Sequence, residues 1–259
     1  MKQRGILELV SKAIIEDGLC DALFLKGSLA RHEEDDYSDI DLYCVVSTHN
    51  QTSFLAKRLD YLLTYQDILY HSEANFVGPQ IIVVYEDGTH IDLYMVTIDT
   101  IIESDQIHVL YDPKSLLEHY QAQPLVLTDE EVRQLIDGFS FTMFEFYHAY
   151  MRDDFVFAFK LANLLHTDYT QMYRYFKQPG FSKISSKRFI FCLSPEEKEH
   201  YLYLTKQLKY DGVLVAVKMI VDEMQQLILT LPLAITFNVN YVFFEYGKKK
   251  IFQLIEVRK

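Results

Sequence analysis

The spacing of apolar residues changes near residue 125, and this change constrains the fold more than any other feature. Before it, short apolar runs typical of strands mix with helical spacing; after it, three- and four-residue steps between apolar residues predominate. We therefore predict an α+β chain, with an N-terminal mixed-sheet domain over residues 1–122 and a C-terminal all-α helical bundle domain over residues 123–259. The length of 259 residues, 49% of them hydrophobic, is sufficient for two such cores.

Turn and stop residues define the elements of the first part. Gly18 follows a run of helical spacing and predicts its end. Asp87-Gly88 separates two apolar runs and suits the two-residue turn of a hairpin. The predicted elements are a helix over residues 6–15, strands over 22–26 and 39–46, a helix over 52–63, and a hairpin of 81–86 and 89–96.

The second part contains two capping boxes. Thr128 with Glu131, and Ser194 with Glu197, each predict the first turn of a helix. The stretch 238–256 is compatible with a helix or a hairpin, and we favour a helix. The predicted helices cover residues 128–150, 154–176, a segment that begins at 195, 213–231 and 238–256.

The formal net charge of −12 limits the choice of partners. It disfavours a nucleic-acid polymer but still permits a nucleotide, provided that a cation lies between carboxylates and phosphates. It equally permits the simpler reading that the charge only maintains solubility. No apolar run approaches about 20 residues, so we expect no membrane span. The N-terminus lacks the apolar region of a signal peptide and the three cysteines fit no disulfide pattern, so we expect a cytoplasmic location.

The segment 23–46 carries the chemistry. A buried strand runs into Gly27-Ser28, and Asp39-Ile40-Asp41 begins the next apolar strand. Residues two apart in a strand point to one face, so Asp39 and Asp41 project together. Asp92 of the hairpin is a third carboxylate that could come from the same sheet. Because carboxylates repel one another, we predict that these three bind divalent cations, most simply two Mg²⁺ ions that clamp a displacement at phosphorus.

The Gly-Ser turn fits a phosphate-binding role. Glycine permits close approach of the backbone, and the Ser28 hydroxyl can donate to phosphate oxygens. Arg31 lies one helical turn further and is a candidate triphosphate contact. Lys26 is a weaker candidate, since its alternation with Leu25 is compatible with a position that faces solvent.

Each of these residues also has a structural interpretation. Gly-Ser is a common turn, and Asp-x-Asp occurs on exposed strand ends. His90 fits a surface histidine better than a ligand. An aromatic run on the helix after residue 128 fits core packing better than an acceptor pocket; its members are Phe139, Phe141, Phe144, Phe146, Tyr147 and Tyr150.

The motif GSLARHEEDDYSDIDLY, residues 27–43, together with Asp92, resembles the DNA polymerase β-like nucleotidyltransferase superfamily. Within it, the chain looks most similar to two-domain antibiotic nucleotidyltransferases, lincosamide enzymes first and aminoglycoside enzymes more distantly. The resemblance implies a catalytic domain over residues 1–122 and transfer of AMP from ATP, or from another NTP, to an acceptor hydroxyl.

The resemblance also implies roles for residues. Asp39 and Asp41 would hold metal, and Asp92 would help to activate the hydroxyl; some relatives use a helical-domain acid instead, here Glu145, Asp153 or Asp154. A lincosamide or aminoglycoside is the expected acceptor. A protein-modifying enzyme of antitoxin type, a non-catalytic nucleotide-binding module and a homodimer stay open.

Overall fold

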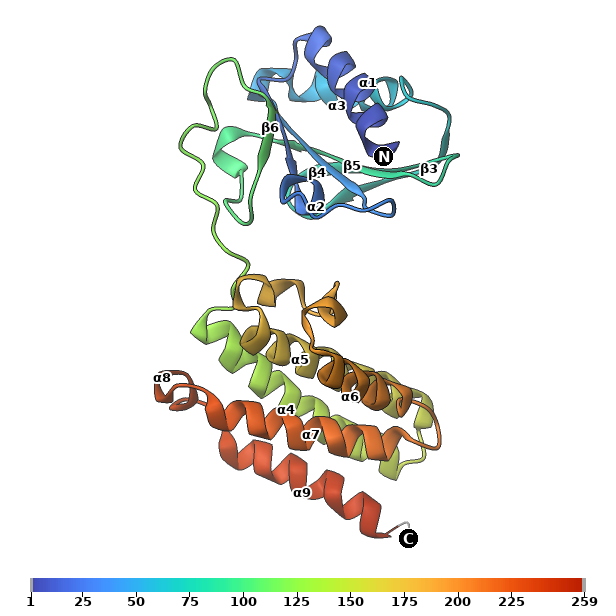
Figure 1. Cartoon of the computed structure of the whole chain (residues 1–259), viewed down its shortest axis with the longest axis vertical. Helices are drawn as coiled ribbons and strands as arrows, with labels where there is room; N and C mark the ends of the chain where they lie inside the picture. The colour runs from blue at the N-terminus through green and yellow to red at the C-terminus, as the bar shows by residue number, and fades with distance from the viewer. Residues whose placement is uncertain (1, 258–259) are drawn as a thin grey trace. The chain divides into compact units, whose positions relative to one another are not determined.

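The computed structural model describes residues 2–257, with the side chains of 255–257 left aside. The chain forms two compact units that divide between Pro124 and Leu125. Each unit has its own hydrophobic core, and Figure 1 shows strands only in the first of them. The predicted α+β class, with a mixed sheet followed by helices, is confirmed.

The first unit is built on a six-stranded sheet with the order β3-β4-β5-β2-β1-β6. The pair of β2 and β5 is parallel, and the other neighbouring pairs are antiparallel. The strands are β1 (Ala22–Lys26), β2 (Ile40–Val45), β3 (Ile68–Asn75), β4 (Pro79–Tyr85), β5 (His90–Val96) and β6 (His108–Tyr111).

Two helices, α1 (Lys2–Asp17) and α3 (Gln51–Leu62), pack on one face of this sheet, as Figure 1 shows. The side chains that meet them are apolar: in the central row, Leu25 of β1 is paired with Leu42 of β2, which is paired with Leu93 of β5. Burial of such rows supplies most of the driving force for this unit. We call this side of the sheet the helix-covered face.

The other side of the same strands holds a smaller apolar cluster. Its centre is a row of three stacked rings, Phe24, Tyr43 and Tyr94, with centroids 5.1 and 4.3 Å apart. Gln80 donates a hydrogen bond of 3.1 Å to the Tyr94 hydroxyl. We call this side the open face; the four-residue helix α2 (Gly27–Ala30) follows directly on β1 at its edge.

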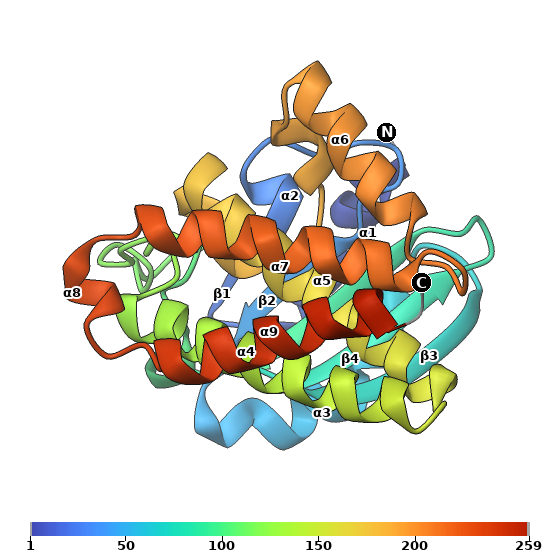
Figure 2. The same cartoon turned by 90° about the horizontal axis from the view of Figure 1, so that it is seen from below.

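The second unit is helical, and Figure 2 shows its long helices running side by side. Thr128 and Ser194 form the two predicted capping boxes. The stretch 238–256, which we favoured as a helix, is helical from Tyr241 onwards. The helices are α4 (Asp129–Met151), α5 (Phe155–Lys177), α6 (Pro195–Lys206), α7 (Val213–Thr230), α8 (Leu233–Thr236) and α9 (Tyr241–Val257). Short 3₁₀ helices lie at Thr48–Asn50, Ile98–Thr100, Pro179–Ile184 and Phe189–Cys192.

Two strands and one short helix escaped prediction. β3 and β6 are the edge strands, and their side chains are mostly exposed or half-buried, so they lack the apolar run that marks a buried strand. The four residues of α8 are too few to show a period. No helix within residues 2–257 combines the length and the apolar character that a membrane span needs.

Candidate active site

Three charged residues form one row across the open face. Lys26 at the end of β1 is paired with Asp41 of β2, and Asp41 is paired with Asp92 of β5. Residues paired across neighbouring strands point to the same side of a sheet. The structure therefore brings together Asp41 and Asp92, which are 51 positions apart in the sequence and were predicted to share a site.

Gly27 lies directly against the Asp41 carboxylate. A Cβ atom at position 27 would lie 2.3 Å from Asp41 Oδ2, and the Gly27 φ of +69° belongs to the left-handed region. The positive φ favours glycine here, and a Cβ atom would displace the Asp41 carboxylate from its position. Asp39 precedes the first residue of β2, is half-buried, and lies two positions from Asp41.

The next feature of the turn is the buried hydroxyl group of Ser28. Its Oγ is buried and has no hydrogen-bond partner among the residues that the structure describes. A buried hydroxyl without a partner is costly, and its presence points to a group that binds there. A phosphate oxygen beside the Gly-Ser turn would satisfy it.

Asp92 is hydrogen-bonded to His90, two residues before it on β5. The side chain of His90 contacts Asp92 Oδ1 through Nε2 at 2.8 Å, and Asp92 is 9% exposed. This hydrogen bond is the main reason that the pKa of His90 is raised, and the charges of Asp92, Asp39 and Asp41 raise it further against the effect of burial. We favoured a satisfied surface histidine over a ligand; His90 is half-buried, and Asp92 is the partner that satisfies it. The His-x-Asp alternation on one strand was the signal for this contact.

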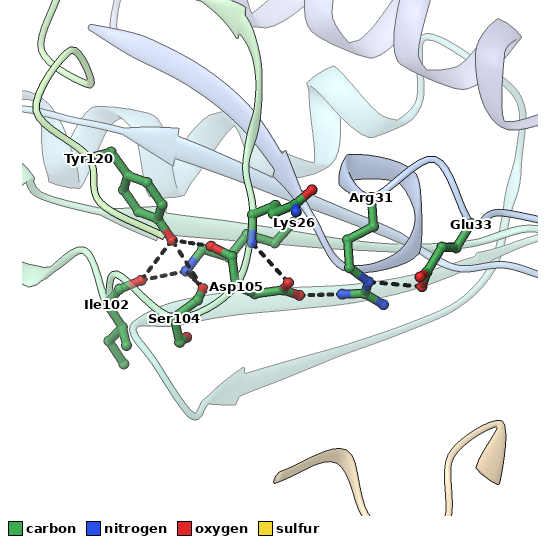
Figure 3. Close-up of polar contacts among 8 residues, drawn as sticks. Lys26, Arg31, Glu33, Ile102, Ser104, Asp105 and Tyr120 are labelled. Atoms are coloured by element: carbon green, nitrogen blue, oxygen red, sulfur yellow. Dashed lines mark hydrogen bonds and ion pairs between the residues drawn. The ribbon is translucent and has the colours of Figure 1, made fainter. Parts of the chain in front are cut away.

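Lys26 does not face solvent, which corrects our interpretation. Its side chain is buried, with 8% of the residue exposed. Its Nζ donates to the carbonyl oxygens of Ile102 and Ser104 at 2.5 and 3.1 Å (Figure 3). These acceptors lie more than 70 positions away, so alternation along β1 could not reveal them.

Arg31, the candidate triphosphate contact, is engaged by carboxylates. Its Nε donates to Glu33 at 2.9 Å and its Nη1 binds Asp105, as Figure 3 shows. Its side chain is 12% exposed. The guanidinium is therefore fixed near the Gly-Ser turn, and contact with a triphosphate would compete with these two acids.

The carboxylates suit Mg²⁺, although no group of three or more His, Cys, Asp or Glu side chains in the described part of the chain is placed to hold a metal ion. Mg²⁺ commonly takes one or two carboxylates and completes its shell with water and substrate phosphates. The Asp41–Asp92 row, with Gly27 removing the side chain that would block Asp41, fits that need.

The acids of the helical unit that were candidates, Glu145, Asp153 and Asp154, have other surroundings. Asp154 caps α5 by accepting from the Phe157 amide at 3.2 Å. Glu145 and Asp154 line a cavity of about 290 Å³ together with Phe141, Phe144 and His148. In the aromatic run, Phe139, Phe146 and Tyr150 are core residues, as favoured, whereas Phe141 is 53% exposed. Asp153 has a left-handed φ of 57° in the turn between α4 and α5.

A family model identifies the chain as a nucleotidyltransferase, and the predicted superfamily and enzyme class are confirmed. It belongs to the streptomycin adenylyltransferase family, whose model matches residues 1–252. The chain is also similar to a solved aminoglycoside 6-adenyltransferase from Bacillus subtilis, with 13% identity, a TM-score of 0.34, and coverage of 95% of this chain and 97% of that one. No curated protein sequence matches the chain. The family that matches is named for an aminoglycoside, streptomycin, and not for a lincosamide, although the resemblance placed the lincosamide enzymes first.

Proposed function

We propose that this protein transfers AMP from ATP to a hydroxyl group of an aminoglycoside, with Mg²⁺ held by Asp39, Asp41 and Asp92. The observation that carries the proposal is the pairing of Asp41 with Asp92 on neighbouring strands, beside a glycine whose Cβ would clash with Asp41. Two in-register carboxylates beside the Gly-Ser turn are oxygen ligands of the kind that a nucleotide–magnesium complex uses.

The nucleotide would bind through the turn. The Ser28 hydroxyl, which lacks a partner among residues 2–257, would donate to a phosphate oxygen, and the amides that follow Gly27 would add to it. Mg²⁺, when bound, would neutralise phosphate charge and polarise the bond to the leaving group. Arg31 would contact the triphosphate by exchanging Glu33 for a phosphate oxygen, while Asp105 keeps its guanidinium in place.

Asp92 would act on the acceptor. His90 occupies Asp92 Oδ1, so Oδ2 is the oxygen that remains for the acceptor hydroxyl or a metal ion. The hydroxyl proton passes to Asp92, the hydroxyl oxygen bonds to the α-phosphorus, and the bond to the β-phosphate breaks, which releases pyrophosphate. His90 holds the carboxylate in place for this transfer.

Charge and family both support an aminoglycoside as the acceptor. An aminoglycoside carries several ammonium groups, which a protein with a net charge of −12 attracts. The family model is described by an aminoglycoside substrate, streptomycin. A lincosamide, with less positive charge, is the second acceptor to test.

The test is a transfer assay. Purified protein, MgCl₂ and labelled ATP, GTP, CTP or UTP would be incubated with a panel of aminoglycosides and lincosamides. We expect label from ATP on an aminoglycoside, release of pyrophosphate, and loss of both on removal of Mg²⁺. Asp41→Asn should abolish transfer, whereas Asp60→Asn, which changes an exposed acid on α3, should not.

Other outcomes would redirect the assignment. Label on proteins of a cell lysate, with none on any drug, would favour the antitoxin-type enzyme. ATP binding that Asp41→Asn leaves unchanged, without turnover, would favour a nucleotide-binding module. Size-exclusion chromatography would test whether the protein forms a homodimer. Separate expression of residues 1–122 and 123–259 would test the predicted domain division.

A further inference from the structure

A buried ammonium group lies immediately before the Gly-Ser turn. Lys26 Nζ donates to the carbonyl oxygens of Ile102 and Ser104, and it lies 5.4 and 5.6 Å from the ring centroids of Tyr43 and Tyr120. A buried cation is costly unless acceptors surround it. Carbonyl oxygens and the faces of two aromatic rings are such acceptors, so the site is built for a cation.

The segment 102–105, which accepts the hydrogen bonds of Lys26, makes further hydrogen bonds to other parts of the chain. The Tyr120 hydroxyl lies 3.0 Å from the Ser104 carbonyl oxygen and 2.9 Å from that of Asp105. The Asp105 amide donates to the carbonyl of Gln123 at 2.7 Å. We call residues 102–105 the anchor segment.

The anchor segment also holds the residue on the other side of the Gly-Ser turn. Asp105 binds the guanidinium of Arg31, while Ile102 and Ser104 bind Lys26 (Figure 3). The turn of Gly27 and Ser28 is thus enclosed between two basic residues that are fixed to one short segment. Movement of that segment would move both ends of the turn.

We propose that Lys26 is a positioning residue for the nucleotide: its buried ammonium group fastens the anchor segment to the end of β1 and so holds the Gly-Ser turn and Arg31 in the geometry that binds the triphosphate. This inference rests on the proposed function, since it assigns the triphosphate to that turn. Lys26 acts through Gly27, Ser28 and Arg31 and does not itself touch the phosphates.

The chemistry of the anchor explains why a neutral side chain cannot replace the lysine. An apolar residue would leave two carbonyl oxygens without their charged donor, and the anchor segment would shift to regain water. The shift would reach Arg31 through Asp105. The acceptor does not depend on this contact, so its binding should be unchanged.

The experiment compares ATP with AMP, which lacks the β- and γ-phosphates. Dissociation constants of both nucleotides, with Mg²⁺, would be measured by calorimetry on the full chain as wild type, Lys26→Met, Lys26→Arg and Tyr120→Phe. For Lys26→Met we expect about tenfold weaker ATP binding, equivalent to about 1.4 kcal/mol, with AMP affinity and the acceptor KM nearly unchanged. Lys26→Arg should restore part of the loss, and Tyr120→Phe should show a smaller loss of the same kind.

Lys114→Met is the matched control, because Lys114 is exposed and binds Asp21 at the opposite end of β1. It should bind both nucleotides as the wild type does. If Lys26→Met fails to fold, Tyr120→Phe carries the test alone. Equal losses for ATP and AMP, or wild-type ATP affinity in both variants, would overturn the inference. A wild-type protein that neither binds ATP nor transfers AMP would instead overturn the proposed function.

Discussion

The two faces of the first unit's sheet are made by the same strands and yet have opposite characters. On the helix-covered face, the central row is Leu25, Leu42 and Leu93, all buried. One residue along, on the open face, the row is Lys26, Asp41 and Asp92. The alternation of a strand allows one backbone to serve a core and a charged site at once.

The difference shows how the site is kept in place. The register that pairs Leu42 with Leu93 also pairs Asp41 with Asp92, so apolar packing on one face sets the carboxylate positions on the other. The stacked rings of Tyr43 and Tyr94 add a second apolar row next to the charges. Substitutions on the two faces should therefore have separable effects.

The largest effect is expected on the open face. Asp41→Asn should lower AMP transfer by about 10³-fold, since it removes a charged ligand from the reacting phosphates. Stability should stay equal or rise slightly, because Asp92 loses a like-charged neighbour. Steady-state kinetics and a thermal melt would measure both. Transfer at a near-normal rate would remove the distinction between the faces.

The next effect belongs to the helix-covered face. Leu42→Ala, one residue away, should lower the free energy of unfolding by about 2–5 kcal/mol, because Leu42 is fully buried between Leu25 and Leu93. Transfer per folded molecule should remain near the wild-type rate at low temperature. Denaturant titration would measure the free energy of unfolding, and the transfer assay would measure the rate. A stable variant with lost turnover would show that the two faces are not separable.

A smaller effect concerns the glycine beside Asp41. Gly27→Ala should cost about 2 kcal/mol of stability and also weaken ATP binding, because Ala is strained at the left-handed φ and its Cβ meets Asp41 Oδ2. Gly18→Ala provides the control: φ is +73° there, but nothing lies within 4 Å of the added Cβ. The control should lose stability only. Equal ATP affinity in both variants would contradict the contact with Asp41.

The smallest effect concerns Asp168 of the helical unit, a carboxylate outside the candidate site. Its substitution should change stability through the cost of burying a charge. Burial in the helical unit raises the pKa of Asp168 to about 6 from the ordinary 3.8. The folded state therefore binds this proton more tightly, and stability falls as the pH rises from about 4 to 6. Asp168→Asn should gain about 1 kcal/mol at pH 8, with allowance for screening of a half-buried group, and little at pH 4. Melts at both pH values would test it; an equal gain at both would contradict the sign.

The parts of the fold that were predictable depend on local signals. The helices α4 and α6 begin at capping boxes within four residues, and the hairpin of β4 and β5 turns at Asp87-Gly88. The strands β3 and β6 lack an apolar run and could not be predicted in this way.

The candidate site divides along the same line. Gly27, Ser28, Asp39 and Asp41 belong to one short motif, and the nucleotidyltransferase superfamily was predictable from it. The pairing of Asp41 with Asp92 depends on a parallel register between distant strands, which no local pattern determines. The burial of Lys26 depends on carbonyl groups at positions 102 and 104, so its neighbours in sequence were misleading. The catalytic roles of these residues stay predictions.

The central claim is that Asp41 and Asp92 jointly bind a nucleotide through Mg²⁺. The most direct test is calorimetric titration of wild type, Asp41→Asn and Asp92→Asn with a non-hydrolysable ATP analogue, in Mg²⁺ and in EDTA. We expect EDTA to weaken the wild type at least about tenfold, and each variant to bind in Mg²⁺ as weakly as the wild type does in EDTA. If Asp92→Asn binds the analogue as tightly as the wild type, with the same dependence on Mg²⁺, the claim is contradicted.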